Sequence, residues 1–179
     1  KHIIISLRKT MKYKVFDNFL EEKDFKALEK IKFSKINSNN MRVFHNTINK
    51  DGTIIKNDCI EKTTLKNLQI KYHPKALEIL KELCPEKVKL YDFSEFHIIQ
   101  TGANYKFPPH DDTPIKLLSG VIYVEPMENK GTMFCRDKKG SDKEEIKWKK
   151  NRAVFFSRKE RETWHSYEGD RKSERIDSL

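Results

Sequence analysis

Two histidines and an aspartate in the second half of the chain have side chains and a spacing that could hold a metal ion. His110 and Asp112 form a His-x-Asp pair, and His165 follows much later, beside Trp164. Two imidazoles and one carboxylate can occupy one face of a ferrous ion and leave its other positions open for a cosubstrate and oxygen. We therefore expect His110, Asp112 and His165 to bind one Fe(II).

The composition of the chain weakens the evidence that a single motif of this kind provides. With 6 His and 27 acidic residues in the chain, roughly one His-x-acid triplet is expected by chance. Asp111 is a competing carboxylate, but adjacent residues point apart, so we expect it to face solvent or substrate. The remaining histidines have no partner spacing and are interpreted as structural or surface residues; they are His2, His45, His73 and His97.

An arginine follows the last histidine at a useful distance. Arg175 lies ten residues beyond His165, and in one continuous β-strand this even separation keeps both side chains on the same face. Its guanidinium could then pair with a carboxylate bound to the same metal. Arg171, in a polar stretch, is the alternative and is interpreted as a surface charge.

The overall composition restricts the function classes. The chain has 179 residues, enough for one domain, and a net charge of +10. Lysines are spread along the chain and interleaved with glutamates, which is typical of a solvated surface and argues against a specific nucleic-acid partner. No run of 18 apolar residues is present, so we expect no membrane span.

The cysteines and the first residues bear on the compartment. Cys59, Cys84 and Cys135 are widely spaced and form neither a CxxC zinc pattern nor a disulfide framework. The apolar run within residues 1–8 is too short for a secretory signal. We predict a cytoplasmic location, where a reducing environment suits a ferrous site.

Hydrophobic periodicity predicts helices first and strands later. One amphipathic helix is expected over residues 18–31 and a second over 74–83, with Pro74 in its first turn. Asp51-Gly52 predicts a hairpin turn. From residue 88 onward β patterns dominate, which favours a sandwich or jelly roll; the expected strands are 93–100, 117–124, 132–135, 145–148 and 153–156.

The order of motifs resembles a known enzyme family. An aromatic-containing segment precedes the His-x-Asp pair, and apolar, Gly-Thr-Met-Phe and Arg-x-Val-Phe-Phe segments follow before Trp164-His165 and Arg175. This order resembles the Fe(II)/2-oxoglutarate-dependent dioxygenases, in particular the prolyl 4-hydroxylase-like branch. The resemblance covers residues 91–179 closely and 13–36 loosely.

The resemblance implies a fold and a set of cofactors. The fold would be mainly β with N-terminal helices: a double-stranded β-helix, or jelly roll, over about 88–179, supported by a helical part over about 13–87, in one domain spanning 1–179. The cofactors would be Fe(II), 2-oxoglutarate and O2, with ascorbate as an optional reductant.

The resemblance also implies roles for individual residues. Arg175 and Tyr123 would bind the distal carboxylate of 2-oxoglutarate, and Tyr105 and Gln100 would line the pocket. Trp164 would pack against the site. One position departs from the family: many relatives carry a hydroxyl residue two positions after the arginine, where this chain has Asp177. An aspartate there would repel the cosubstrate carboxylate unless its side chain is turned away.

The expected activity is hydroxylation of an unactivated C–H bond, with a prolyl or other residue of a peptide or protein as the first candidate substrate and small molecules still open. One alternative is a nucleic-acid base oxygenase or demethylase; the single well-spaced arginine argues against it. The other is a non-catalytic metal-binding jelly roll, against which the complete triad and Arg175 argue.

Overall fold

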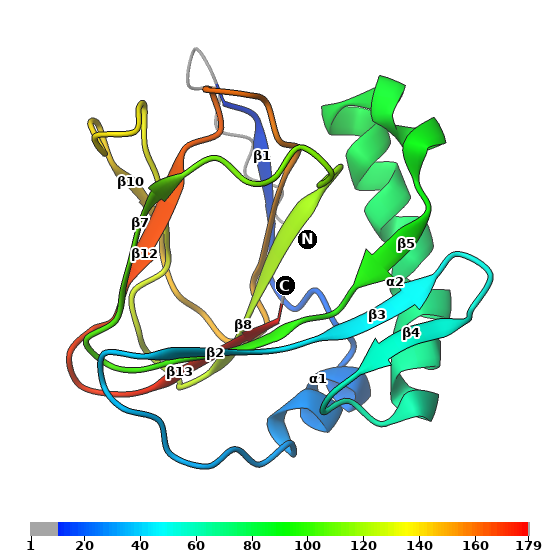
Figure 1. Cartoon of the computed structure of the whole chain (residues 1–179), viewed down its shortest axis with the longest axis horizontal. Helices are drawn as coiled ribbons and strands as arrows, with labels where there is room; N and C mark the ends of the chain where they lie inside the picture. Colours follow the sequence, from blue (N-terminus) through cyan, green and yellow to red (C-terminus); the bar gives the residue numbers. More distant parts are fainter. Residues whose placement is uncertain (1–10, 179) are drawn as a thin grey trace.

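The computed structural model of this protein describes residues 11–178. Within them, a large antiparallel sheet curves around and faces a smaller one, so that together they enclose a barrel (Figure 1). The strand order is β1-β11-β8-β13-β6-β2 in the larger sheet and β10-β9-β12-β7 in the smaller; a third sheet, β4-β3-β5, lies beside helix α2.

The strands are short and their bounds are as follows. The larger sheet contains β1 (Tyr13–Phe16), β2 (Met41–Phe44), β6 (Ile98–Thr101), β8 (Ser119–Glu125), β11 (Ala153–Phe156) and β13 (Arg175–Ser178). The smaller sheet contains β7 (Lys106–His110), β9 (Thr132–Phe134), β10 (Glu144–Ile146) and β12 (His165–Glu168). The third contains β3 (Asn46–Asn49), β4 (Ile54–Asn57) and β5 (Phe93–Glu95).

Aromatic side chains hold the two facing sheets together. Phe134 of β9 stacks on Tyr13 of β1, with ring centroids 4.7 Å apart, and contacts Phe156 of β11 edge-on at 5.4 Å. All three are at most 4 % exposed. Aromatic pairs in such geometries stabilise a core beyond the area they bury, so this cluster fixes the spacing of the sheets.

Two helices and a short 3-10 helix cover the outside of the larger sheet. These are α1 (Glu22–Glu29), α2 (Lys62–Leu83) and η1 (Pro85–Leu90). Phe25 and Leu28 of α1 and Leu65 and Leu68 of α2 are buried in one apolar cluster with side chains of the sheet. Burial of these apolar stripes, spaced by three residues, is what makes the two segments amphipathic helices.

The second helix is longer than the sequence pattern predicts. α2 begins at Lys62, twelve residues before the expected start, and Pro74 lies inside it. The buried stripe formed by Leu65, Leu68 and Tyr72 continues through this point. Proline removes one backbone hydrogen bond, to the residue four positions earlier. That residue, Ile70, is 72 % exposed, so the loss falls on the solvent side of the helix.

The expected strand over 93–100 is two strands in different sheets. β5 pairs with β3 and β6 with β2 and β13, and the chain changes direction between them. Buried Asn46 stabilises this break, because its amide donates to the carbonyl of Phe96 at 3.1 Å and accepts from the backbone of Asp58 at 3.1 Å. His97, at the break, contacts His45 and Glu95.

Other expectations have simpler outcomes. The Asp51-Gly52 turn joins β3 and β4 as predicted, and the three cysteines are free thiols. No helix within residues 11–178 is long and apolar enough to cross a membrane. The segment 1–8, considered above as a signal, lies outside the described residues.

Candidate metal centre

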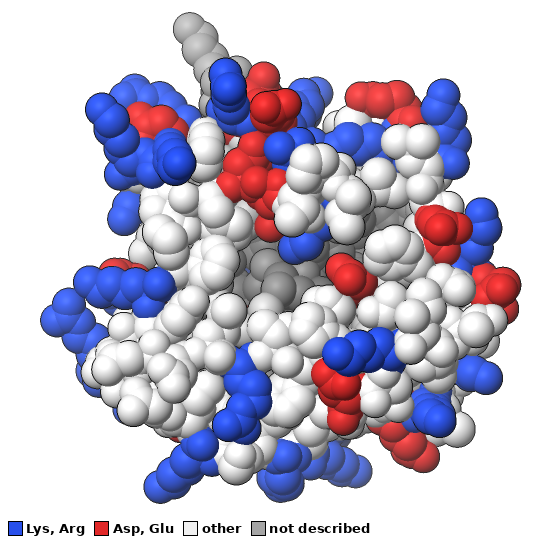
Figure 2. Space-filling model, in the orientation of Figure 1, with Lys and Arg blue, Asp and Glu red and all other residues white. Residues whose placement is uncertain are grey.

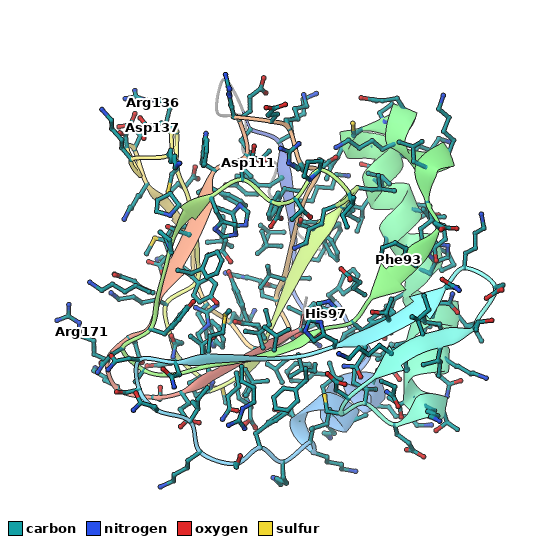
Figure 3. All side chains as sticks on the ribbon, viewed as in Figure 1. Phe93, His97, Asp111, Arg136, Asp137 and Arg171 are labelled. Carbon is teal, nitrogen blue, oxygen red and sulfur yellow. The ribbon has the colours of Figure 1, made fainter. Side chains whose placement is uncertain are left out.

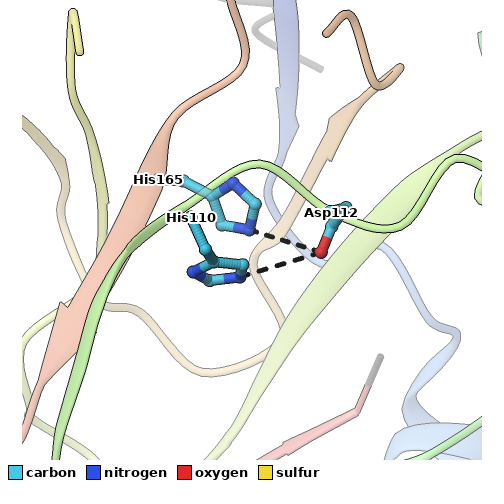
Figure 4. Close-up of side chains that lie close together, drawn as sticks. All are labelled: His110, Asp112 and His165. Carbon is cyan, nitrogen blue, oxygen red and sulfur yellow. Dashed lines mark ion pairs between the residues drawn. The ribbon is translucent and has the colours of Figure 1, made fainter. Parts of the chain in front are cut away.

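Strand pairing brings the two histidines of the triad together. His110 is the last residue of β7 and His165 the first of β12, and the two are directly opposite in the antiparallel register. Opposite residues in such a pair point to the same face of the sheet. Asp112 follows β7 and turns back toward both rings, as Figure 4 shows.

The three ligand atoms converge. Asp112 Oδ1 lies 3.7 Å from His110 Nε2 and 3.8 Å from His165 Nε2. One ligand atom from each residue lies within 4.8 Å of the other two. A single ion bound at about 2.0–2.2 Å from each atom fits such spacings. The donor set of two imidazoles and one carboxylate suits ferrous iron.

Backbone carbonyls fix which imidazole nitrogen faces the metal position. His110 Nδ1 lies 3.0 Å from the carbonyl oxygen of Pro108, and His165 Nδ1 lies 2.9 Å from that of Thr163. A carbonyl only accepts, so each Nδ1 carries the proton and each Nε2 keeps a free lone pair. Metal-binding histidines in proteins are oriented by this kind of bond.

The carboxylate of Asp112 is oriented from its other side. Ser119 Oγ donates to Oδ2 at 2.5 Å, and Lys116 Nζ lies 3.3 Å from Oδ1. Arg158 Nε donates to the backbone carbonyl of Asp112 at 2.5 Å. Because Ser119 occupies Oδ2, the oxygen left to face both histidines is Oδ1.

The local electrostatics keep the ligands in the form that binds a metal. Burial lowers the pKa of His110, and it lowers the pKa of His165 to about 4. Burial would raise the pKa of Asp112, but electrostatic interaction with the His165 ring, the charge of Lys116 and the bond from Ser119 lower it below its usual value. Neutral imidazoles and an ionised carboxylate are therefore available at neutral pH.

Asp111 has a structural role that the sequence interpretation missed. Its carboxylate accepts from Thr163 Oγ1 and from the backbone N–H of Arg161, both at 2.7 Å. Its side chain is only 6 % exposed, so it faces neither solvent nor a substrate space. It ties the segment before β12 to the end of β7 (Figure 3) and thereby holds His165 opposite His110.

Arg175 lies across the barrel from the histidines. The continuous strand assumed above does not exist, because β12 belongs to the smaller sheet and β13, which begins at Arg175, to the larger. The Arg175 side chain is 1 % exposed and points inward. Its guanidinium carbon lies 4.5 Å from the ring centroid of Tyr167 and 5.0 Å from that of Trp148.

Tyr123 lies beside this guanidinium without a hydrogen bond to it. Its hydroxyl donates to Thr132 Oγ1 at 3.0 Å and accepts from the backbone N–H of Thr132 at 2.8 Å. Its ring stacks on Trp148 with centroids 4.5 Å apart, and burial raises its pKa to about 12. These contacts align the hydroxyl and leave it uncharged.

The aromatic side chains of Trp148 and Tyr167 contact the Arg175 guanidinium and were not identified from the sequence. Tyr167 is two residues after His165, so alternation along β12 places both side chains on the inner face. That spacing was a usable signal. Trp148 lies beyond the end of β10, in an irregular segment whose direction no periodicity predicts.

An aromatic wall connects the arginine to the triad. Tyr167 stacks on Phe107 at 5.4 Å, and Phe107 contacts the ring of His110 at 4.1 Å. Tyr105, half-buried, lies 6.2 Å from Tyr167, at the edge of the same group. A series of ring contacts therefore links the arginine to the His110 side of the triad.

Three residues considered for the site lie elsewhere. Gln100 pairs with Ile176 rather than Arg175, so alternation turns it outward, where its amide donates to Ser34 and Glu174. Trp164 donates to the carbonyl of Arg161 in the preceding loop instead of packing on the triad. Arg171 is exposed and points away from the barrel (Figure 3).

A cavity of about 250 Å³ lies beside α2, and no residue of the triad lines it. Apolar side chains of α2 and of the segments 90–96 and 115–118 form much of its wall, to which Glu95 and His97 also belong. Lys116 and Ser119, which contact Asp112, belong to the same wall. Figure 2 shows a hollow near the centre of this face, where β8 lies in Figure 1.

Comparison with family profiles and with curated proteins gives no match, whereas comparison with solved structures does. Among solved structures, a prolyl-4-hydroxylase of Pseudomonas putida is similar with a TM-score of 0.57 and 12 % identity, over 94 % of this chain and 90 % of that one. The non-haem alpha-ketoglutarate-dependent epimerase SnoN of nogalamycin biosynthesis has a TM-score of 0.57 at 10 % identity, over 95 % and 76 %.

A third similar structure is OsALKBH1, with a TM-score of 0.55 and 7 % identity over 98 % of both chains. At such identities the comparison establishes the architecture. The resemblance seen in the sequence is thus confirmed at the level of the fold: this chain has the fold of the Fe(II)/2-oxoglutarate-dependent dioxygenases, with a His-Asp-His triad inside it.

Proposed function

We propose that this protein is an Fe(II)- and 2-oxoglutarate-dependent dioxygenase that hydroxylates an unactivated C–H bond in a prolyl or other residue of a peptide or protein. The convergence of His110, Asp112 and His165, with both Nε2 atoms freed by bonds at Nδ1, carries the proposal. We take the two facing sheets to be the halves of a double-stranded β-helix with the metal between them.

The side chains of the site have separate tasks in this proposal. Bound iron and 2-oxoglutarate supply the oxidising power, because oxidation of the cosubstrate to succinate and carbon dioxide leaves one atom of O2 for the C–H bond. The triad holds the ion, with Ser119 orienting Asp112. Arg175 pairs with the distal carboxylate of the cosubstrate. The rings of Phe107 and Tyr167 keep bulk water from the space between them.

The substrate enters, in this proposal, through the cavity beside α2. Its wall is mostly apolar, and three of the large apolar side chains left exposed by the fold line it: Leu90, Phe93 and Ile115, at 59 %, 38 % and 74 % exposure. Clustered exposed apolar groups mark binding sites for partners or ligands. An apolar ring such as that of a prolyl residue suits this wall, and the proposal is supported by Lys116 and Ser119, which line the cavity and contact Asp112.

The charge distribution favours a peptide over a nucleic acid. On the face that carries the hollow, Lys and Arg lie around the edge and alternate with Asp and Glu (Figure 2). A surface that tracks a phosphate backbone gathers basic groups in a continuous stripe. Nucleic acid is therefore the alternative substrate class in the test below, and a metal-binding role without catalysis is the other outcome.

The test is a turnover assay with a substrate panel. Peptides with and without proline, free amino acids and oligonucleotides are incubated with the protein, Fe(II), ascorbate and 2-oxoglutarate. Succinate and the mass gain of one oxygen are measured, and His165→Ala serves as the inactive control. We expect a proline-containing peptide to gain oxygen in near-equal yield with succinate. Oxidation of an oligonucleotide with every peptide inert would show that the substrate is a nucleic acid. Absence of succinate under every condition would refute the proposal that the protein is an enzyme of this kind.

A further inference from the structure

The cosubstrate pocket already contains a carboxylate. Asp177 lies two residues after Arg175 on the same inward face of β13. Its Oδ2 accepts from Arg175 Nε at 2.8 Å and lies 2.7 Å from NH2. The Nε and NH2 edge of the guanidinium therefore contacts a single oxygen of the carboxylate. The two side chains are 1 % and 4 % exposed. The sequence analysis required the Asp177 side chain to turn away from the cosubstrate carboxylate. The structure instead has the Asp177 carboxylate bonded to Arg175.

The second carboxylate oxygen has no partner. Asp177 Oδ1 is buried and accepts no hydrogen bond from any residue in the described part of the chain. Burial raises the pKa of Asp177 against the opposing effect of Arg175. A buried carboxylate that lacks donors on one oxygen is well disposed to take up a proton there, because the neutral form needs less solvation.

The side chains that surround Arg175 and Asp177 are uncharged. β8 contributes Tyr123 and β12 contributes Tyr167, both neutral phenols, since burial raises the pKa of each. β6 contributes Ile99 and Thr101, the partners of Asp177 and Arg175 in the register, which carry no charge. Within residues 11–178 the charged side chains that meet in this space are Arg175 and Asp177, and together they are neutral.

Arg175 still has hydrogen-bond capacity for a ligand. A guanidinium has five N–H donors. Asp177 accepts the hydrogen of Nε and lies 2.7 Å from NH2, and the carbonyl of Lys130 accepts one hydrogen from NH1 at 3.0 Å. At least one N–H therefore remains on each of NH1 and NH2. A ligand carboxylate can bind there, but it would bring a second negative charge to one buried positive charge.

We propose that Asp177 makes the pocket take up one proton when a dicarboxylic 2-oxo acid binds to Arg175. This inference rests on the proposed function and deepens it. With Asp177 ionised, the incoming distal carboxylate would leave the buried pocket with a net negative charge. With Asp177 protonated on its free oxygen, the carboxylic acid remains in the pocket and the ligand and Arg175 form a neutral pair.

The proton uptake has a measurable consequence for affinity. Binding that takes up one proton weakens as pH rises, by up to about tenfold per pH unit. A 2-oxo acid without a distal carboxylate adds no charge next to Arg175 and lacks this pH dependence. Asp177 thus links cosubstrate affinity to pH through a residue that contacts neither the metal position nor its ligands.

The experiment is calorimetric titration of the full chain with Fe(II) and 2-oxoglutarate without oxygen, so that no turnover occurs. Each titration is repeated in two buffers of different ionisation enthalpy, at pH values of about 6, 7 and 8, which yields the number of protons taken up. We expect close to one proton for the wild type and none for Asp177→Asn, whose affinity should not fall with pH. Pyruvate, a 2-oxo acid without the distal carboxylate, is the ligand control.

Glu174→Gln is the matched control variant. Glu174 is a carboxylate three positions away that points outward, where it accepts from the backbone N–H of Ile36 and from Gln100. It should keep the proton uptake of the wild type. Asp177→Ser supplies a second variant if Asp177→Asn does not fold, and the wild-type proton count needs no variant.

The outcomes separate this inference from the proposed function. Binding of 2-oxoglutarate by the wild type without proton uptake, with the same pH dependence as Asp177→Asn, overturns the role of Asp177 and leaves the dioxygenase proposal intact. Absence of 2-oxoglutarate binding in the wild type and in both Asp177 variants overturns both. Binding only in the variants overturns the proton uptake as well, because Asp177 would then exclude the ligand instead of taking up a proton.

Discussion

Two backbone carbonyls decide the chemistry of the triad. The carbonyl of Pro108 accepts a hydrogen bond from Nδ1 of His110, and the carbonyl of Thr163 accepts one from Nδ1 of His165. The Nε2 atoms are therefore committed to the metal position before any ion arrives. Because burial lowers the pKa of His165 to about 4, protons compete for this ligand only in distinctly acid solution.

Removing a triad ligand should abolish metal binding. We expect Asp112→Ala and His165→Ala to weaken Fe(II) binding by more than the about 10–100-fold typical of a lost outer-shell bond, because two remaining ligands hold the ion poorly. Anaerobic calorimetry measures this. Asp111→Asn, which alters the neighbouring loop anchor, should retain most of the affinity. Wild-type iron binding in His165→Ala would show that the triad is not the metal site.

The distal carboxylate of the cosubstrate should depend on Arg175 and not on Arg171. Arg175→Ala removes charge-assisted hydrogen bonds worth roughly 1.5–3 kcal/mol each, so we expect Kd for 2-oxoglutarate to rise by about tenfold to a hundredfold or more. Arg171→Ala, at an exposed position, should leave Kd unchanged. The opposite ranking would place the carboxylate clamp outside the barrel.

At the scale of elements, the sequence predicted where strands and turns lie better than it predicted which strands pair with one another. Local patterns located the apolar strands and the Asp51-Gly52 turn, because alternation and turn chemistry are local. They could not show that residues 93–100 divide between sheets, since Asn46, far away in sequence, creates the break. β7 was not among the strands predicted from local patterns, because Pro108 and Pro109 remove ladder donors; such a strand is tolerated at the edge of its sheet.

The expectation for Arg175 shows why a correct placement can rest on a wrong premise. The even spacing from His165 presumed one strand, yet the chain turns between β12 and β13 and changes sheets. Arg175 faces inward because of its register with Thr101 in β6. Register between distant strands depends on pairing and packing, which a single sequence does not reveal. For the same reason Gln100, adjacent to Thr101, was assigned to the wrong face.

The first strand is held to the barrel by an ion pair that should respond to pH. Asp17 accepts from Arg152 Nε at 2.7 Å and from Lys149 Nζ at 2.9 Å. The bond from Arg152, opposed by partial burial and helped by Lys149, lowers the pKa of Asp17 to about 2 from 3.8. Between these values the unfolded chain binds more protons than the folded one. The stabilisation is therefore complete above about 3.8 and lost as pH falls through about 2.

We expect Asp17→Asn to lower the free energy of unfolding at neutral pH and to differ less and less from the wild type as pH falls toward 2. Urea titrations at neutral pH and at about pH 3 measure the difference. Glu22→Gln is the control, because Glu22 makes only an exposed pair with Lys26 within α1. If the free energies of unfolding of Asp17→Asn and the wild type differ by the same amount at both pH values, the destabilisation comes from altered packing and not from the lost charge.

At the scale of the whole molecule, the helices outside the barrel make one wall of the cavity beside the metal position. α2 packs on the third sheet and on β11, and η1 leads directly into β5. This support therefore serves two ends: it buries the outer face of the larger sheet and shapes the space through which a substrate would reach Asp112. Leu90, Phe93 and Ile115 line it and remain exposed.

Ile115 and Ile70 offer a direct test of that space, because they are equally exposed but differently placed. Ile115 is 74 % exposed and lines the cavity, whereas Ile70 is 72 % exposed on α2 and does not line it. Covering one apolar side chain contributes about 1.5–3 kcal/mol, so Ile115→Glu should raise KM for an apolar peptide by roughly tenfold or more. Iron and 2-oxoglutarate binding should not change, since the substitution touches neither site. Ile70→Glu should leave KM unaltered, and equal KM values for the two variants would mean that the substrate approaches the metal from another side of the barrel.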